Sequence, residues 1–318
     1  MKITVLGAGA YGVALATILN EKNDVTVYSV IKSEIDSLNE TYRNEKLFPN
    51  IEISRKIKFT NNIDEALNDT SFIVIAIPTN YLSDTVNLLN NKINKDINIC
   101  IASKGINNKE CKFAYDIVHD ILKTDNISVL AGPSFAIDTI KKENIILSLA
   151  GNNIKDLKKF FPSFIKIETT SDIIGVELCG TLKNIFAISC GILDGMNTSE
   201  STKSSYLTKI INETMNIICK FNGLKETILL SCGIGDIILT CSSKKSRNFS
   251  LGYLIGSKSD KDKIEDYLKN TTVEGLDAII SIKKVFEEKN IKSEIIDLIY
   301  DIILNNDDPK KLLNYIVK

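Results

Sequence analysis

A single lysine stands out in the second half of the chain, because its neighbours are almost all uncharged. The run from Leu178 to Leu193 contains one charged side chain, Lys183. A helix of this composition should be buried on most sides, and a lone buried ammonium has a lowered pKa. Such a lysine is a competent proton donor near neutral pH. The alternative is a lysine that extends to the surface from a half-exposed helix, and the sequence does not decide between the two.

A polar cluster follows further along the chain. Its members are Asp236, Thr240, Ser246, Arg247 and Asn248. Asp236 is the only acidic residue between Glu226 and Asp260, so it does not belong to a solvated run of charges. Arg247 is one of three arginines, and its planar fork can bind a phosphate through two hydrogen bonds where lysine cannot. We expect a substrate-phosphate site here; a capping or surface role for Arg247 is the alternative.

Three glycines near the start of the chain have the spacing G-x-G-x-x-G. Gly7, Gly9 and Gly12 follow an apolar strand directly and open a helix, which is the context this motif requires. The first glycine permits a tight turn, the second lets the backbone approach a pyrophosphate, and the third lets helix and strand pack closely. The N–H groups at the start of the helix then bind the anion. The pattern predicts an NAD- or NADP-binding site, with a purely structural glycine turn as the alternative.

Further candidates follow the predicted strands of the same half. In a doubly wound sheet, ligands bind at the carboxyl ends of the strands. Lys104 comes just after the strand at 97–102, so we expect it to point toward the cofactor. Gly132 and Ser134 follow the strand at 129–131. Glycine and proline at strand ends can also mark a turn and nothing more.

The elements that must position these residues change in character along the chain. Apolar strands are predicted at Ile3–Leu6, Val25–Tyr28, Lys56–Phe59, Phe72–Ile77, Ile97–Ala102, Val129–Ala131, Ile145–Leu149 and Phe164–Ile167. Runs that are apolar at every position are typical of a parallel sheet covered on both faces. Helical periodicity follows at Ile174–Leu193, Leu207–Phe221, Glu274–Lys289, Glu294–Leu304 and Lys310–Val317. We predict an α/β protein: an N-terminal Rossmann-like doubly wound sheet (1–172), then an all-helical domain (173–318), meeting at a cleft.

Composition excludes several kinds of function. Lys+Arg of 39 against Asp+Glu of 40 gives a net charge of −1, so we expect no nucleic-acid partner. The one histidine, His119, falls on the polar face of a helix predicted over Cys111–Leu122. One such histidine cannot build a histidine-rich metal site, and it weakens any mechanism that uses histidine as the base. We expect no metal.

The cysteines and the apolar runs indicate a cytoplasmic protein. The seven cysteines contain no C-x-x-C pair, which favours reduced and mostly buried thiols. The uncharged run Ile3–Leu19 is broken by the three glycines, and we expect no other apolar stretch to approach the roughly 20 residues that a membrane span needs.

Taken in order, these segments resemble the NAD(P)-dependent glycerol-3-phosphate dehydrogenases of the bacterial type. The matching pieces are GAGAYG at 7–12, SKGI at 103–106, AGPSFA at 131–136, DIIGVELCGTLKN at 172–184, GIGDIILTCSS at 233–243, SRN at 246–248 and VEG at 273–275. The resemblance implies hydride transfer between NAD(P)H and dihydroxyacetone phosphate to give sn-glycerol 3-phosphate for phospholipid synthesis. It also suggests a homodimer.

The resemblance assigns roles to individual residues. It implies Lys183 as the catalytic acid/base, with catalytic support from Lys104, Asn184, Asp236 and Thr240. The substrate would be bound by Lys104, Gly132, Ser134, Lys183, Asp236, Ser246, Arg247 and Asn248. The cofactor would be bound by Gly7, Gly9, Ala10, Tyr11, Gly12, Lys104, Ala136, Arg247 and Glu274.

The preference between NAD and NADP stays open. NAD-specific folds usually place an acid at the end of the second strand, but here Tyr28 is followed by no acid until Glu34. Bacterial members of the family usually carry an arginine there, which this chain lacks; Lys32 could pair with a 2′-phosphate or be a solvated helix-start residue. Two other functions also remain as alternatives: a two-domain dehydrogenase of a β-hydroxy or branched keto acid, and a non-catalytic dinucleotide sensor.

Overall fold

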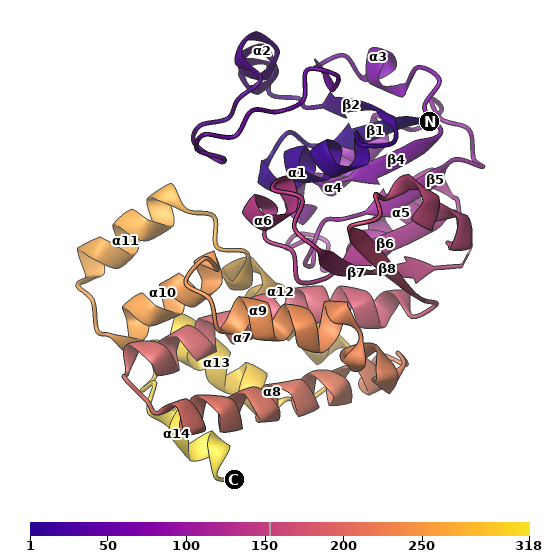
Figure 1. Ribbon diagram of the computed structural model, residues 1–318. Helices are drawn as coiled ribbons and strands as arrows, with labels where there is room; N and C mark the ends of the chain where they lie inside the picture. The colour runs from indigo at the N-terminus through magenta and orange to yellow at the C-terminus, as the bar shows by residue number, and fades with distance from the viewer. Residues whose placement is uncertain (153) are drawn as a thin grey trace. The chain divides into compact units, whose positions relative to one another are not determined.

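The computed structural model describes residues 1–152 and 154–318, which form two compact units. The sheet unit comprises Met1–Lys104 and Ala114–Ile173, and the helical unit comprises Gly105–Phe113 and Ile174–Lys318. Each unit has an apolar core of its own. In Figure 1 the sheet unit runs from indigo to magenta, and the main part of the helical unit from pink to yellow.

Eight strands form one sheet in the order β3-β2-β1-β4-β5-β6-β7-β8. They are β1 (Lys2–Leu6), β2 (Asp24–Tyr28), β3 (Lys58–Thr60), β4 (Phe72–Ile75), β5 (Asn98–Ile101), β6 (Ile127–Ala131), β7 (Ile145–Gly151) and β8 (Ile165–Thr170). The chain runs from β1 out to β3 and returns to β4 on the other side of β1. The strand order therefore reverses between β1 and β4, the switch point at which doubly wound sheets bind ligands.

One pair of strands departs from the expected parallel sheet. β6 and β7 pair antiparallel, with Leu130 opposite Leu149, while β7 and β8 are parallel again. The connection from β6 to β7 contains only the five-residue helix α6 (Ala136–Ile140). A parallel crossover must return along the whole length of the sheet, usually through a longer helix, whereas an antiparallel partner needs no such return. The apolar pattern did not reveal the reversal, because both orientations bury the strand on two faces.

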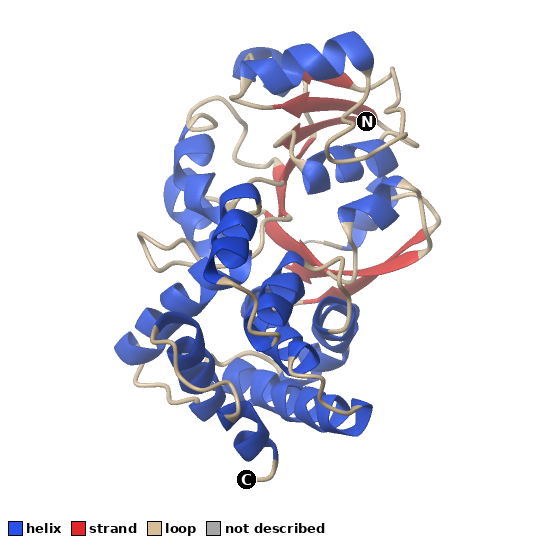
Figure 2. Ribbon diagram, turned by 90° about the vertical axis from the view of Figure 1, so that its left-hand side faces the viewer, coloured by secondary structure: helices blue, strands red, loops and turns tan. Residues whose placement is uncertain are grey.

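Helices lie on both sides of the sheet, as Figure 2 shows, and this confirms the doubly wound prediction. Besides α6 they are α1 (Ala10–Leu19), α2 (Lys32–Thr41), α3 (Ile63–Leu67), α4 (Leu82–Asn87) and α5 (Ala114–Leu122), with 3₁₀ turns at Thr79–Tyr81 and Lys155–Phe160. His119 lies on α5 with 40% of its side chain exposed, and its Nε2 is 3.4 Å from an Asp125 carboxylate oxygen. The predicted solvent-facing position of this histidine is confirmed.

The helical unit packs around a long central helix, α7 (Ile173–Gly195), whose side chains are almost all buried. The other helices are α8 (Glu200–Lys220), α9 (Asp236–Cys241), α10 (Arg247–Gly256), α11 (Lys261–Asn270), α12 (Glu274–Glu288), α13 (Glu294–Leu304) and α14 (Lys311–Ile316). A 3₁₀ segment at Lys225–Leu229 and a π-helical turn at Ser231–Gly235 lead into α9. Helix α8 begins earlier than its periodicity predicted, because the Ser199 side chain caps it by accepting a hydrogen bond from the Thr202 N–H at 3.2 Å.

A short segment from the first half of the sequence belongs to the helical unit. Residues 105–113 place Ile106 and Phe113 in its core, and the Phe113 ring meets Phe221 edge-on at 6.0 Å between centroids. A division of the chain at 172/173 assigns this segment to the first domain. Its packing assigns it to the second, and a linear boundary cannot describe such an excursion.

Helix α7 is long and apolar enough to cross a membrane by length and composition, with a mean hydropathy of 1.5 over its most apolar window. The expectation that no stretch besides the N-terminal run approaches this length is therefore wrong. In the structure 89% of that window is buried inside the protein. This burial is typical of the core helix of a folded unit.

Helices α7 and α10 approach each other through glycines on both sides. The four glycines are Gly191 and Gly195 on α7, and Gly252 and Gly256 on α10. A methyl group at Gly252 would lie 1.9 Å from the Ile188 carbonyl oxygen, and one at Gly191 would lie 2.0 Å from the Phe249 carbonyl oxygen. Only hydrogen fits at these positions, so the two backbones are in direct contact.

We expect the substitution Gly252→Ala to destabilise the protein by about 1–3 kcal/mol, because the added methyl group must push α10 away from α7. The same change in an uncrowded helix would stabilise it by about 1 kcal/mol. Urea unfolding of both proteins measures the difference, with Ser204→Ala on the exposed face of α8 as the control. A stability equal to or above that of the wild type would contradict the close contact.

Candidate active site

The glycine loop, residues 7–12, connects β1 to α1 at the switch point of the sheet. Gly7 has a φ of +118°, and a methyl group there would lie 2.5 Å from the Ala76 carbonyl oxygen. A methyl group at Gly12 would lie 2.1 Å from the Gly7 carbonyl oxygen. These two glycines are therefore required by the packing of the loop and the helix against the strands.

Gly9 is different, because among the described residues no atom outside its chain neighbours and its own helix backbone lies within 4 Å of the position that its Cβ would occupy. It is the N-cap residue of α1, it makes no side-chain cap, and the first turn of the helix carries no acidic residue. A side chain at this position would fill the space in front of the N-terminal N–H groups of the helix. A bound pyrophosphate needs that space, so the loop fits a dinucleotide.

The other candidates of the sheet unit gather beside this loop. The hydroxyl groups of Tyr11 and Ser134 form a hydrogen bond of 2.9 Å, and Ser134 donates to the Gly132 carbonyl oxygen at 3.2 Å. The Lys104 Nζ lies 5.6 Å from the centre of the Tyr11 ring, a cation–π distance. Ala10 and Ala136 are the first residues of α1 and α6, two helices that pack together.

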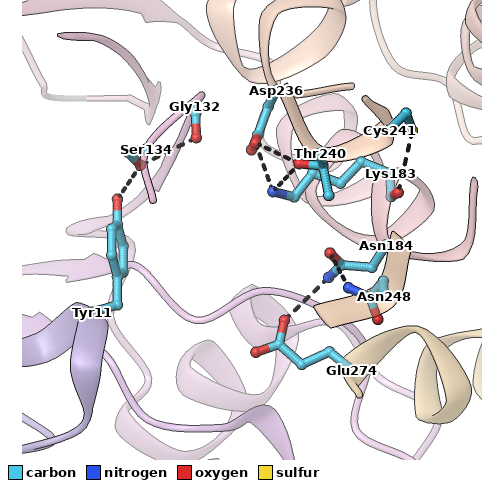
Figure 3. Close-up of polar contacts among 10 residues, drawn as sticks. All are labelled: Tyr11, Gly132, Ser134, Lys183, Asn184, Asp236, Thr240, Cys241, Asn248 and Glu274. Atoms are coloured by element: carbon cyan, nitrogen blue, oxygen red, sulfur yellow. Dashed lines mark hydrogen bonds and ion pairs between the residues drawn. The ribbon is translucent and has the colours of Figure 1, made fainter. Parts of the chain in front are cut away.

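The lysine cluster of the helical unit consists of Lys183, Asp236 and Thr240, which point toward one another in Figure 3. The Lys183 Nζ lies 2.6 Å from Asp236 Oδ1 and donates to Thr240 Oγ1 at 3.2 Å. Thr240 in turn donates to Asp236 Oδ1 at 3.2 Å, across one turn of α9. Only 8% of the lysine side chain and 1% of the aspartate side chain are exposed. The cluster is a buried ion pair with a hydroxyl group bridging it.

The cluster corrects both interpretations of Lys183. The lysine does not extend to the surface, and it is not a lone ammonium, since Asp236 neutralises it. The apolar neighbours of Lys183 along α7 correctly indicated burial. They gave no sign of the partner, which lies on α9.

One thiol lies against the cluster, and a second thiol lies beside the first. Cys241 Sγ donates to the Lys183 carbonyl oxygen at 3.9 Å, and burial together with the Cys190 thiol raises the pKa of Cys241 well above its usual value. Cys241 therefore stays a neutral thiol and adds no negative charge beside the ion pair. Of the seven cysteines, which are all free, five are buried as expected, while Cys111 is half-buried and Cys219 is exposed.

A series of hydrogen bonds between amide and carboxylate side chains joins α7, α10 and the start of α12. Asn248 Nδ2 donates to Asn184 Oδ1 at 3.0 Å, and Asn184 Nδ2 donates to Glu274 Oε2 at 3.2 Å. The backbone N–H of Gly275 donates to Asn248 Oδ1 at 2.8 Å. The residue type of Gly275 carries no signal of this role, because the donor is its backbone N–H.

The start of α10 presents Arg247 beside these hydrogen bonds. Ser246 caps the helix, since its Oγ accepts the Phe249 N–H at 3.3 Å. Arg247 Nη2 lies 3.4 Å from Glu274 Oε1, and 53% of the arginine side chain is exposed. The first turn of α12 therefore contacts both residues: Gly275 donates to the buried Asn248, and Glu274 pairs with the exposed Arg247. Ser246, and not Arg247, is the cap of α10, while Arg247 lies exposed at the surface, as its surface alternative expects.

Across residues 1–152 and 154–318, no group of three or more His, Cys, Asp or Glu side chains is placed to hold a metal ion.

Known protein families match both halves of the chain. The model of the NAD-dependent glycerol-3-phosphate dehydrogenase N-terminus matches residues 2–156, and that of the C-terminus matches residues 172–314. The glycerol-3-phosphate dehydrogenase (NAD(P)+) of Clostridium botulinum (strain Eklund 17B / Type B) is 33% identical over 97% of this chain and 94% of the relative. That of Mesoplasma florum is 32% identical over 99% of this chain and 97% of the relative.

A solved structure supports the same assignment. The crystal structure of glycerol-3-phosphate dehydrogenase from Coxiella burnetii has a TM-score of 0.91 and 26% identity, and the match covers 100% of this chain and 98% of that one. The matches decide against a keto-acid dehydrogenase and a non-catalytic sensor. The glycine loop, the lysine cluster and the full-length matches agree: the chain belongs to the family of NAD(P)-dependent glycerol-3-phosphate dehydrogenases, oxidoreductases that interconvert glycerol 3-phosphate and dihydroxyacetone phosphate.

Proposed function

We propose that Lys183 is the proton donor and acceptor of this reaction and that Arg247 and Asn248 bind the substrate phosphate. The observation that carries the proposal is the buried ion pair of Lys183 and Asp236, with Thr240 bridging it. A buried ion pair is seldom retained for stability, because well-packed apolar residues of similar volume serve as well or better. A chemical role for the ammonium gives a reason to keep it.

Lys183 is suited to act at the oxygen that changes protonation. Bound NADH or NADPH supplies the hydride to the ketone carbon. The ketone oxygen gains negative charge as the alcohol forms, and a buried ammonium stabilises that charge and delivers a proton to it. In the reverse direction the neutral amine takes the proton from the hydroxyl group. Asp236 and Thr240 fix the position of the lysine Nζ, and solvent restores the proton between turnovers.

Arg247 and the start of α10 are suited to bind phosphate. Glu274 holds one Nη of Arg247, while the half-exposed guanidinium offers further N–H donors in a planar fork. The backbone N–H groups in the first turn of α10 favour an anion as well. The Asn248 amide nitrogen gives one hydrogen to Asn184, and we propose that its second hydrogen serves the phosphate. Anchoring the phosphate positions the carbonyl group for reaction.

The remaining assignments follow the family resemblance. We propose catalytic positioning by Asn184 and Thr240, and substrate contacts from Lys104, Gly132, Ser134, Asp236 and Ser246. We propose cofactor contacts from Gly7, Gly9, Ala10, Tyr11, Gly12, Lys104, Ala136, Arg247 and Glu274. On the same resemblance we propose a cytoplasmic homodimer that makes sn-glycerol 3-phosphate for glycerophospholipid synthesis, and domains divided near residue 172 apart from the segment 105–113.

Replacing Lys183 by Ala should lower kcat about a hundredfold or more, because the ketone oxygen loses its proton donor. NADH binding, measured by titration without substrate, should change little, which shows that the protein remains folded. A small primary amine added to the assay should restore part of the rate.

The matched control is Lys203→Ala, which removes another ion-paired lysine of the helical unit, bonded to Asp194 and Glu200. Its kcat should equal that of the wild type. Turnover that is unchanged in Lys183→Ala, or lost equally in both variants, would end the assignment of Lys183.

Replacing Arg247 by Lys should raise the KM for dihydroxyacetone phosphate about tenfold and leave kcat within a few-fold of the wild type, because lysine replaces a planar fork with a point charge. Inhibition by inorganic phosphate should weaken in parallel. The control is Arg55→Lys in the sheet unit, where the arginine pairs with Glu52. Equal kinetics in Arg247→Lys and the wild type would remove Arg247 from the phosphate site.

A further inference from the structure

We propose that Glu34 makes this protein select NAD(H) over NADP(H). The family binds a nicotinamide dinucleotide, and the sequence alone left the choice between the two open. The inference concerns the adenosine end of the cofactor and rests on cofactor binding at the glycine loop; it is independent of the lysine chemistry.

The structure brings the Glu34 carboxylate back to the end of β2. Ser29 follows β2 directly, is buried, and is tied to the end of β3 by its N–H, which donates to the Thr60 carbonyl oxygen at 3.3 Å. Its hydroxyl group donates to Glu34 Oε2 at 3.1 Å and accepts the Ile31 N–H at 3.2 Å. Glu34 lies five residues after Ser29 in the sequence, but this hydrogen bond holds its carboxylate beside the end of β2.

The position is the one at which dinucleotide folds distinguish the two cofactors. About twenty residues after the glycine motif, an acid at the end of the second strand accepts a hydrogen bond from the ribose 2′-hydroxyl of NAD. In NADP that hydroxyl carries a phosphate, whose negative charge would face the Glu34 carboxylate. The Glu34 carboxylate would therefore accept a hydrogen bond from NAD and repel the 2′-phosphate of NADP.

Two exposed apolar side chains next to Ser29 support a nucleoside at this place. Val30 and Ile31 are both exposed, although residues of their type are usually buried. They offer an apolar surface to a flat ring such as adenine. This surface would serve NAD and NADP equally, so it supports the location and leaves the discrimination to Glu34.

Three basic residues that follow β2 have carboxylate partners. Lys32, the nearest, forms an ion pair with Asp36 at 2.7 Å along the exposed face of α2. The two arginines of the sheet unit, Arg43 and Arg55, pair with Glu45 at 3.2 Å and Glu52 at 3.4 Å. Residues 29–36 contain one lysine and two acids, so recruiting Lys32 to a 2′-phosphate would still leave a negative segment around it.

The test is direct binding of NADH and NADPH to the full chain without substrate, measured by calorimetry. We expect the wild type to bind NADH about tenfold or more tightly than NADPH, the size of a charged hydrogen bond. Glu34→Gln should tighten NADPH binding and reduce the preference for NADH about tenfold, since it removes the charge. Glu40→Gln is the matched control: it removes the same charge from the exposed, far end of α2 and should keep the wild-type preference.

Three results would overturn the proposal: a wild type that binds NADPH as tightly as NADH, a Glu34→Gln variant with an unchanged ratio, or an equal shift in Glu40→Gln. NADH binding by each variant also reports that it is folded.

This proposal can fail while the proposed function stands, because an enzyme that prefers NADPH can still depend on Lys183. The reverse also holds, since NADH selection in the binary complex does not involve proton transfer.

Discussion

The helical unit depends on one requirement, that the buried ammonium of Lys183 has a carboxylate beside it. Removing one partner of a buried ion pair typically costs about 3–5 kcal/mol, because the other charge is left without compensation. Asp236 must therefore stay within contact of α7, and the π-helical turn at Ser231–Gly235 leads directly into the first turn of α9, where it sits. Thr240, one turn later, completes the cluster from the same helix. The geometry of α9 follows from the charge on α7.

A second constraint acts between α7 and α10. The glycines leave no freedom in the separation of these helices, because a carbonyl oxygen of one helix occupies the space that a side chain of the other would need. Asn184 lies about two turns before Gly191, and Asn248 about one turn before Gly252. Contact at the glycines thus brings the two amides within 3.0 Å of each other. The proposed proton donor and phosphate site keep a fixed distance along neighbouring helices.

Features of this protein that local patterns encode are predictable from its sequence, whereas features that depend on tertiary neighbours leave no such pattern. The glycine motif, the change from alternating strands and helices to helices alone, and the isolation of Asp236 and Arg247 are local features. The first two correspond to the loop between β1 and α1 and to the helical unit. The Lys183–Asp236 pairing is not local, since it joins α7 to α9. Ser29 and Glu34 are only five residues apart, but their hydrogen bond depends on how the chain turns from β2 into α2. The reversed strand β7 and the excursion at 105–113 were missed for the same reason. An apolar run buries itself equally well in either direction, and a nine-residue segment does not reveal which core it joins.

The contacts of Arg247 explain why an arginine stands at this position in a chain whose basic residues are mostly lysines. The Glu274 side chain divides its two oxygens, one to Asn184 and the other to Arg247. A guanidinium can donate to that oxygen through one Nη and still direct other N–H groups toward a phosphate, because its five donors are spread over a rigid plane. A lysine ammonium would place its single charge either with Glu274 or with the phosphate. The exposed pairs of Arg43 and Arg55 impose no such double demand, so the residue type matters most at position 247.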